Sequence, residues 1–189
     1  MSDEQSARIE ESGEALQARL ESLQEQFGEA LLSVKLTDQE LDFTVVPEAL
    51  AEFVAALRKQ LLPPQHSFCD VCGVERDDAI EAIYRLSLIF QPRRVTIRTR
   101  TSKTAPVLPT LSHLYKGALW PERELAEMFG VRIEGHPDLR HLLLPQDWKG
   151  YPLRKDYQYP MDHPYLAPDP LREDPASVLC PAQEPEEQE

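Results

Sequence analysis

The sequence predicts an α+β fold in which a mostly antiparallel, mixed sheet is flanked by helices and followed by an extended C-terminal loop and tail. Three observations support this class. Alternating apolar runs bounded by turn residues indicate strands, apolar residues at helical spacing indicate amphipathic helices, and proline and glycine punctuate the chain beyond residue 130. Two strands, a helix, three strands and then further helices are typical of α+β proteins.

The first predicted element is an amphipathic helix over residues 4–27, which Gly28 is placed to end. Its apolar face is formed by Ile9, Leu16, Leu20, Leu23 and Phe27. We therefore divide the chain into three parts. Residues 1–28 form an N-terminal helix that is part of the domain, residues 29–160 form the α+β domain, and residues 161–189 form an acidic, proline-rich tail.

Two strands and a second helix are predicted next. Residues 31–36 and 41–46 have strand-like composition on either side of the polar turn 37–40. Pro47 then opens a helix, because proline is tolerated in the first helical turn. The apolar side of this helix consists of Leu50, Phe53, Val54 and Leu57.

Three further strands complete the predicted sheet. They span residues 68–75, 79–90 and 93–101, and in the last of them apolar side chains alternate with polar ones, as in a half-buried strand. Residues 103–109 are predicted to form a polar loop. Residues 110–115 are predicted to form a short helix capped by its first threonine.

The charge of the chain limits its partners. The formal net charge is −13 and the pI is near 4.8, so nucleic acid is not expected as a partner. Residues 93–116 are an exception, with 6 bases and no acid. This basic island is interpreted either as a solvated strand face or as a contact with an acidic partner.

Membrane association is expected to be indirect. No run of the sequence approaches the roughly 18 apolar residues of a spanning helix. The acidic N-terminal residues lack the apolar core of a signal peptide. Any link to a membrane is therefore expected to pass through other subunits.

The cysteines are interpreted as structural. Cys69 and Cys72 form a CxxC pair, but a zinc or iron–sulfur site needs about four ligands, and Cys180 lies far off in the tail. A thioredoxin-like pair would stand at a helix N-terminus, whereas this pair falls in a predicted strand. We expect no metal and no redox centre in this chain.

The chain is organised around residues 120–156, which begin with a short helix. Pro121 lies in its first turn, its apolar residues recur at i, i+3 and i+4, and Gly130 stands where the helix would stop. Beyond it follows a charged loop stiffened by proline. Such a segment contains no nucleophile beside a base, and its composition favours docking over catalysis.

The glutamates of this helix have two interpretations. Glu122, Glu124 and Glu127 could form an acid–base pair for catalysis. They lie near a helix N-terminus, and Arg123 stands beside them at i,i+4 from Glu127. We therefore interpret them as partners of the helix dipole and of that arginine.

The loop after the helix also leaves alternatives open. His136 and Asp138 are interpreted as holding a turn or meeting a partner, with proton transfer as the alternative. Further along, aromatic and cationic side chains have the composition of an interaction hot spot, and the alternative is a loop packed on its own domain. These side chains are Trp148, Tyr151, Arg154, Lys155 and Tyr157.

Two linked motifs in this stretch resemble one protein family. The first consists of Glu122-Arg123-Glu124, Glu127-Met128-Phe129, His136, Arg140 and Leu142-Leu143, and the second of Gly150-Tyr151-Pro152-Leu153-Arg154-Lys155-Asp156-Tyr157. Both are similar to the 30 kDa subunit of respiratory complex I, also called the C-type subunit of the proton-pumping NADH-quinone oxidoreductase. More loosely, the resemblance covers residues from about Phe68 to Tyr157.

The resemblance implies a hydrophilic, structural subunit in the peripheral arm of a proton-translocating NADH:quinone oxidoreductase of the respiratory chain. Electrons pass in that complex from NADH through FMN and iron–sulfur clusters to a quinone such as ubiquinone. Those cofactors are expected in partner subunits and none in this chain. The chain would brace the hydrogenase-like large subunit (the D type) that helps form the quinone site, near the iron–sulfur subunits, at the cytoplasmic face of the cell membrane.

The resemblance therefore implies partner contacts and no catalytic, cofactor-binding or metal-ligating residue in this chain. The residues expected to carry these contacts are Glu122, Arg123, Glu124, Glu127, Phe129, His136, Arg140, Trp148, Tyr151, Arg154, Lys155 and Asp156.

Two alternatives remain at this stage. One is the equivalent subunit of a membrane-bound hydrogenase, a formate hydrogenlyase or the ferredoxin-dependent complex of photosynthetic membranes, which would differ in its electron donor. The other is a free-standing soluble enzyme or small-molecule binder, which would need a pocket with convergent polar groups.

Overall fold

The structure is a computed structural model that describes residues 13–37, 39–88 and 93–158. The predicted helical residues 4–12 and the tail 161–189 lie outside these ranges. The helices are α2 (Gly13–Phe27), α3 (Leu50–Gln60) and α4 (Leu119–Phe129), with short 3-10 turns η1 (Gly28–Ala30), η2 (Pro47–Ala49) and η3 (Lys116–Ala118). The strands are β1 (Leu31–Leu36), β2 (Glu40–Val45), β3 (His66–Glu75), β4 (Ala79–Leu88), β5 (Arg94–Ser102), β6 (Val107–Pro109) and β7 (Arg132–Glu134).

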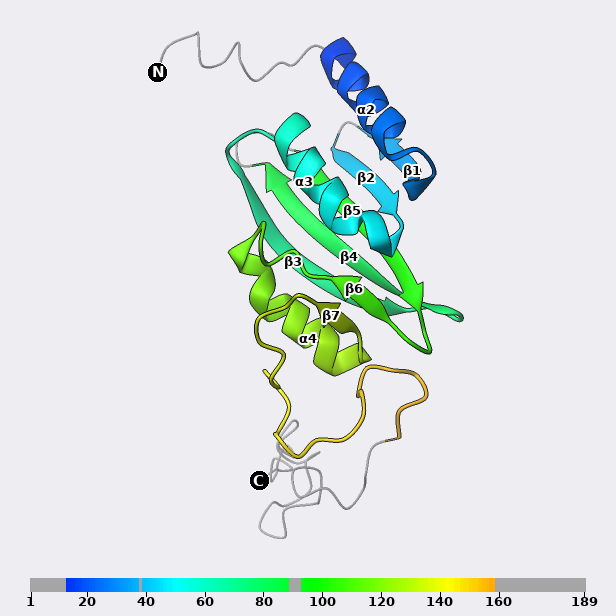
Figure 1. The fold of residues 1–189 in the computed structure, drawn as a ribbon, viewed down its shortest axis with the longest axis vertical. Helices are drawn as coiled ribbons and strands as arrows, with labels where there is room; N and C mark the ends of the chain where they lie inside the picture. Colours follow the sequence, from blue (N-terminus) through cyan, green and yellow to red (C-terminus); the bar gives the residue numbers. More distant parts are fainter. Residues whose placement is uncertain (1–12, 38, 89–92, 159–189) are drawn as a thin grey trace, which may run out of the picture. The chain divides into compact units, whose positions relative to one another are not determined.

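Five strands form one sheet in the order β1-β2-β5-β4-β3 (Figure 1). Neighbouring strands are antiparallel except for β2 and β5, which run parallel. Register places Phe43 opposite Ile97, and Ile97 opposite Tyr84, so the apolar positions of adjacent strands align on one face. The predicted α+β fold with a mostly antiparallel, mixed sheet is confirmed.

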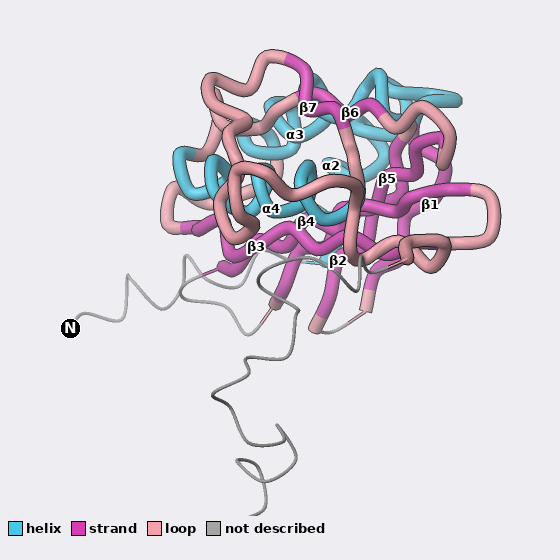
Figure 2. The backbone as a smooth tube through the Cα atoms, turned by 90° about the horizontal axis from the view of Figure 1, so that it is seen from below, coloured by secondary structure: helices cyan, strands magenta, loops and turns pink. Residues whose placement is uncertain are grey.

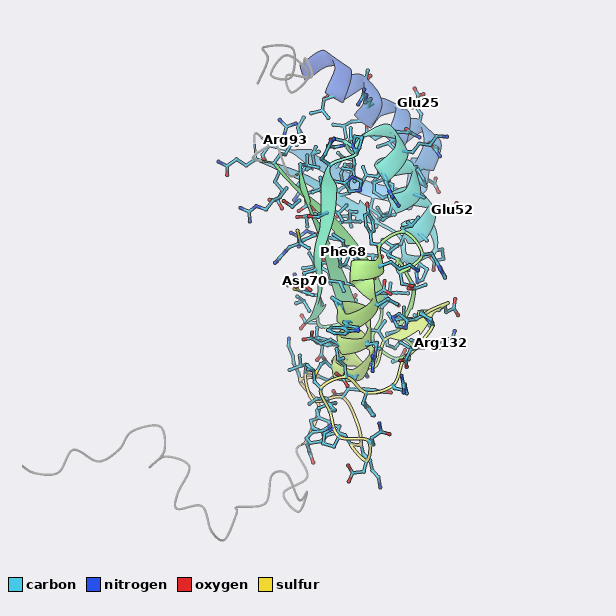
Figure 3. The ribbon with its side chains drawn as sticks, turned by 90° about the vertical axis from the view of Figure 1, so that its left-hand side faces the viewer. Glu25, Glu52, Phe68, Asp70, Arg93 and Arg132 are labelled. Atoms are coloured by element: carbon cyan, nitrogen blue, oxygen red, sulfur yellow. The ribbon has the colours of Figure 1, made fainter. Side chains whose placement is uncertain are left out.

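The three described helices lie on the same face of the five-stranded sheet (Figures 2 and 3). The helical spacing of Phe53 and Leu57 on α3 aims both side chains at the sheet, where they are fully buried. Phe53 packs against the rings of Phe27 and Phe43, at centroid distances of 5.2 and 5.3 Å. The core therefore lies between the helices and one face of the sheet, and the other face carries polar side chains.

Helix α4 approaches the sheet closely at Gly73 of β3. A Cβ atom at this position would come within 2.5 Å of the Phe129 ring and 2.7 Å of the Leu125 side chain. Because glycine has no Cβ, the apolar face of α4 can rest directly on the strand. This contact places α4 and the loop that follows it beside the end of the sheet.

Two segments differ from the prediction. The predicted loop 103–109 contains the short strand β6, which pairs in parallel with β7. Residues 110–115 form a turn rather than a helix, in which the Leu114 and Tyr115 N–H groups donate to the Leu111 carbonyl. The Thr110 hydroxyl oxygen accepts the Ser112 N–H over 3.0 Å, as predicted for a cap, and it also contacts the Glu122 carboxylate of α4. Across the residues that the structure describes, no helix combines the length and apolarity needed to cross a membrane.

Candidate functional site

Helix α4 ends at Gly130, and this end is shaped to receive the returning loop. Gly130 has a left-handed backbone, with φ of 71°, and its N–H donates to the Ala126 carbonyl over 2.8 Å. A Cβ atom here would lie 2.5 Å from the Tyr151 ring. The Leu153 N–H in turn donates to the Met128 carbonyl. The helix end and residues 151–153 are therefore in direct contact.

Glu122 is fully buried and joins α4 to the preceding turn. Its Oε1 accepts the Leu111 N–H over 2.7 Å, and its Oε2 lies 2.6 Å from the Thr110 hydroxyl. Burial raises the pKa of this carboxyl, and the bonds from Thr110 and Leu111 partly oppose that rise. Glu122 therefore stabilises the domain from within and is not available to a partner at the surface.

The buried His136 side chain holds a turn in the loop. Its Nδ1 accepts the Asp138 N–H over 3.1 Å, so the proton of the neutral ring is on Nε2, which donates to the Leu119 carbonyl over 3.0 Å. Nε2 also lies 3.9 Å from the Glu122 carboxylate. Both ring nitrogens therefore have partners within the domain, and the imidazole ties the loop to the start of α4.

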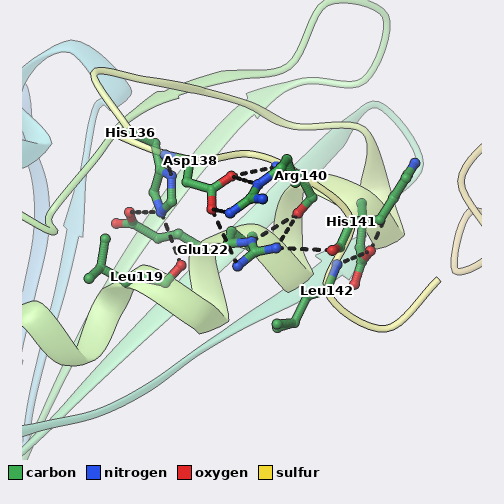
Figure 4. A network of polar contacts seen from close by, with 9 residues as sticks. Leu119, Glu122, His136, Asp138, Arg140, His141 and Leu142 are labelled. Atoms are coloured by element: carbon green, nitrogen blue, oxygen red, sulfur yellow. Dashed lines mark hydrogen bonds and ion pairs between the residues drawn. The ribbon is translucent and has the colours of Figure 1, made fainter. Parts of the chain in front are cut away.

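Arg123 holds the next part of the loop through backbone oxygens. Its guanidinium donates to the Arg140 carbonyl over 2.6 and 2.9 Å and to the His141 carbonyl over 2.9 Å (Figure 4). The predicted pairing of Arg123 with Glu127 is thus replaced by contacts with the loop. Asp138 pairs with Arg140 over 2.8 Å, and this arginine holds the pKa of Asp138 well below its usual range.

Glu127 is the third anchor on α4. Its buried carboxylate accepts the N–H groups of Leu142 and Leu143, each over 2.9 Å, and lies 3.3 Å from Nδ1 of His141. Backbone N–H groups in an irregular segment need acceptors. A helix carboxylate supplies them here and fixes the path of residues 141–144.

A fourth anchor comes from the end of β3. The Glu75 carboxylate accepts the Lys155 N–H over 2.6 Å and pairs with the Lys103 amine, which holds the pKa of Glu75 below its usual range. Beside it, Nε of Arg154 donates to the Phe129 carbonyl over 2.7 Å, and its guanidinium lies 5.0 Å from the Tyr151 ring centroid. The second motif is therefore attached both to the sheet and to α4.

The predicted contact residues differ in exposure, and Arg123, Trp148 and Arg154 are half-buried. Glu122, Glu127, Phe129 and the side chain of His136 are buried in the domain. The rings of Trp148 and Tyr157 stack with centroids 6.3 Å apart. The members at the surface are Glu124, Arg140, Tyr151, Lys155 and Asp156.

Helix α4 and the loop expose large apolar side chains, of which only Tyr151 was among the predicted contacts. Of the seven large hydrophobic side chains exposed within the described residues, five come from residues 120–153. Leu143 leaves 61% of its surface exposed, although both of its neighbours in the Leu142–Leu144 run are less exposed. We define the docking surface as Trp120, Leu139, Leu143, Tyr151 and Leu153. In the sequence, the leucines within and between the motif residues were the feature that could have predicted this surface.

The two cysteines of β3 do not belong to a cluster of metal-ligating side chains among the described residues. Cys69 is exposed, and the Cys72 thiol donates to the Asp70 carboxylate over 3.2 Å. Burial, and then the adjacent Asp70, raise the pKa of the Cys72 thiol, which makes its thiolate less available. Within residues 13–37, 39–88 and 93–158, no three histidine, cysteine or acidic side chains are grouped so as to hold a metal ion.

Comparison with known proteins gives consistent matches. The family model described as "Respiratory-chain NADH dehydrogenase, 30 Kd subunit" matches residues 43–163, which include all the anchors above. The C-type subunit of the NADH-quinone oxidoreductase of Sinorhizobium medicae is 35% identical over 147 residues, covering 76% of this chain and 73% of the relative. Its counterpart in Salinispora arenicola is 36% identical over 142 residues, covering 73% of this chain but only 58% of the relative, which is less than two thirds of its length.

Two solved structures share the fold. One is from the membrane-bound sulfane sulfur reductase, an archaeal respiratory membrane complex, with a TM-score of 0.66 and 21% identity over 84% of this chain and 96% of that chain. The other is a trypsin-resistant fragment of Nqo5, with a TM-score of 0.51 and 23% identity over 66% of this chain and 99% of that fragment.

Proposed function

Because this chain belongs to the family of the 30 kDa subunit of respiratory-chain NADH dehydrogenase, we propose that it is a structural subunit in the peripheral arm of an NADH:quinone oxidoreductase. In this role it braces the hydrogenase-like large subunit that helps to form the quinone site. FMN, the iron–sulfur clusters and the quinone are held by partner subunits. This chain is a non-catalytic component of the assembled enzyme, and its task is to keep distances and orientation constant.

One observation carries the proposal: a loop without regular structure is anchored to the domain and presents apolar side chains outward. Glu122, Glu127 and Glu75 bind backbone N–H groups on or beside this loop, and Arg123 binds its carbonyls. The polar side chains of the motif are therefore engaged in hydrogen bonds within the domain. The contact that the docking surface offers to a partner is therefore apolar.

Anchoring matters because disorder in a contact loop must be lost on binding. Ordering a rotamer-rich side chain at an interface costs about 0.5–1.5 kcal/mol. A loop that is already held by internal hydrogen bonds avoids much of that cost. Leu143, whose N–H is bound by Glu127, is therefore ready to insert into an apolar site on a partner.

The names of the relatives favour NADH as the electron donor of the assembly. The relatives at 33–36% identity are named as parts of NADH-quinone oxidoreductases. The likeness to the archaeal sulfane sulfur reductase reflects the shared fold. We place the chain at the cytoplasmic face of the membrane, where it is held indirectly through its partner subunits.

The proposal is tested by tagging this chain, extracting native membranes in a mild detergent, and identifying the proteins that copurify. We expect a large assembly that contains the hydrogenase-like large subunit together with flavin and iron–sulfur subunits. Hydrogenase or ferredoxin-binding subunits in place of the NADH-oxidising ones would reassign the electron donor. Recovery of the chain alone would overturn the proposal.

A further inference from the structure

The five-stranded sheet has a second face that no described helix covers. On β5, Val95 and Ile97 belong to the core, so the alternating residues Arg94, Thr96 and Arg98 point to the opposite side. Figure 3 shows this side with Asp70 and Arg93 labelled, opposite the side on which Glu25, Glu52 and Arg132 lie. We call it the open face, formed by the outward residues of β2, β5, β4 and β3.

The acidic groups of the open face lie beneath the basic groups. Glu81 is 2% exposed and binds both Arg76, over 2.6 Å, and Arg100, over 3.1 Å, whereas the Arg100 side chain is 60% exposed. Asp42 binds Arg98 over 2.9 Å and is the less exposed partner. Carboxylates therefore form the floor, and guanidinium groups form the outer layer. In a chain of net charge −13, this face turns positive charge to the solvent.

Arg85 and Arg94 stand out on this face. The register of β4 with β5 makes the two arginines diagonal neighbours on adjacent strands. Both are exposed, and neither side chain forms a hydrogen bond or ion pair within the described residues. Each arginine lies opposite an acid in the sheet register, Arg85 opposite Asp70 and Arg94 opposite Glu40. The Asp70 carboxylate accepts the Cys72 thiol, and the Glu40 carboxylate accepts the Thr96 hydroxyl. The two guanidinium groups are therefore available to donate hydrogen bonds together to an anionic group on a partner.

We propose that the open face binds an acidic polypeptide segment of a partner subunit, with Arg85 and Arg94 as its principal contacts. Guanidinium groups bind carboxylates in a bidentate geometry, and a flat sheet suits a protein surface more than a small molecule. Carboxylates lie among the arginines of this face, so its positive charge is confined to a few side chains, which suits a few carboxylates better than the extended phosphates of nucleic acid or of an anionic bilayer. This inference goes beyond the proposed function, because the docking surface is built from α4 and the following loop.

The contact can be identified by replacing both arginines with lysine in the tagged full-length chain. R85K and R94K keep the positive charge and introduce amines, which a carbodiimide joins directly to carboxylates that are in contact with them. After cross-linking in native membranes, mass spectrometry is expected to find these positions joined to aspartate or glutamate of another subunit. Cross-links confined to this chain, or none at these positions, would overturn the proposal.

Charge reversal provides the second measurement. R85E/R94E is expected to lower the amount of assembly recovered with the tagged chain about tenfold, because each arginine loses charge-assisted hydrogen bonds. The matched control is K59E/K116E, which makes the same change in net charge at two exposed lysines on other elements. Circular dichroism establishes that both variants fold.

The outcomes separate this proposal from its rivals. Equal recovery of the two charge-reversal variants would overturn it. Binding of the purified chain to phosphatidylglycerol vesicles that is lost in R85E/R94E would also overturn it, because the face would then recognise a membrane surface. Loss of the assembly in R85E/R94E while the docking surface is intact would support a second, independent contact.

Discussion

Replacing Glu127 with alanine should release the loop at residues 141–144. The carboxylate accepts two backbone N–H groups over 2.9 Å, and its side chain is 4% exposed. A hydrogen bond to a charged group contributes about 1.5–3 kcal/mol. Because the loop is partly exposed and water can replace some of these bonds, we expect a local loss of about 2–4 kcal/mol.

The assay is hydrogen exchange of the Leu142 and Leu143 amides. A local loss of about 2 kcal/mol corresponds to exchange that is about 30-fold faster. E124A is the matched control, since Glu124 lies on the same helix but is exposed. There we expect a change of no more than about twofold. If exchange at these two amides is the same in E127A and E124A, the carboxylate does not hold the loop and the reasoning fails.

Three further outcomes are expected. Gly130→Ala should lower the free energy of unfolding by about 2–4 kcal/mol in a denaturant titration, because alanine strains the left-handed backbone and its Cβ meets the Tyr151 ring. Gly28→Ala is the control: Gly28 has a φ of 48° but nothing within 4 Å of an added Cβ, so the loss should be only about 1–2 kcal/mol. Equal losses in the two variants would refute the packing of Tyr151 against Gly130. Burial raises the pKa of Glu122 in the folded protein above its value in the unfolded chain. The resulting stabilisation is fully present below the unfolded-state pKa, and the free energy of unfolding should fall as pH rises through the folded-state pKa of Glu122. E122Q should flatten this pH dependence, and parallel stability–pH curves for E122Q and the unaltered protein would contradict the prediction. Replacing Cys69 and Cys72 with alanine should leave the metal content and electron transfer of the assembly unchanged, and loss of bound iron or zinc would overturn the structural interpretation of the pair.

Secondary structure with a clear period was predictable from the sequence. The spacing of Leu50, Phe53 and Leu57 predicted the buried side of α3, because only a helix places these positions together. The strands β6 and β7 have three residues each, which is too short for an alternating pattern to appear. The parallel pairing of β2 with β5 joins residues more than fifty positions apart and depends on tertiary contacts.

The motif identified the residues of the candidate site but only part of their roles. Glu122 lies three residues before Leu125, on the apolar face of α4, and this helical spacing held the signal that it is buried while Glu124 is not. In the loop no period exists, so the sequence alone does not distinguish the exposed Leu143 from its neighbour Leu142.

The central claim is that the docking surface joins this chain to its assembly, and the most direct test compares L143D with L32D in the tagged full-length chain. The two leucines are 61% and 62% exposed, so both substitutions should leave the fold of the domain intact. Burying a leucine at an interface is worth about 1.5–3 kcal/mol, so L143D should reduce the copurified assembly by tenfold or more, on the order given by that energy. L32D should retain the amount recovered with the unaltered chain. Equal recovery with L143D and L32D would contradict the account.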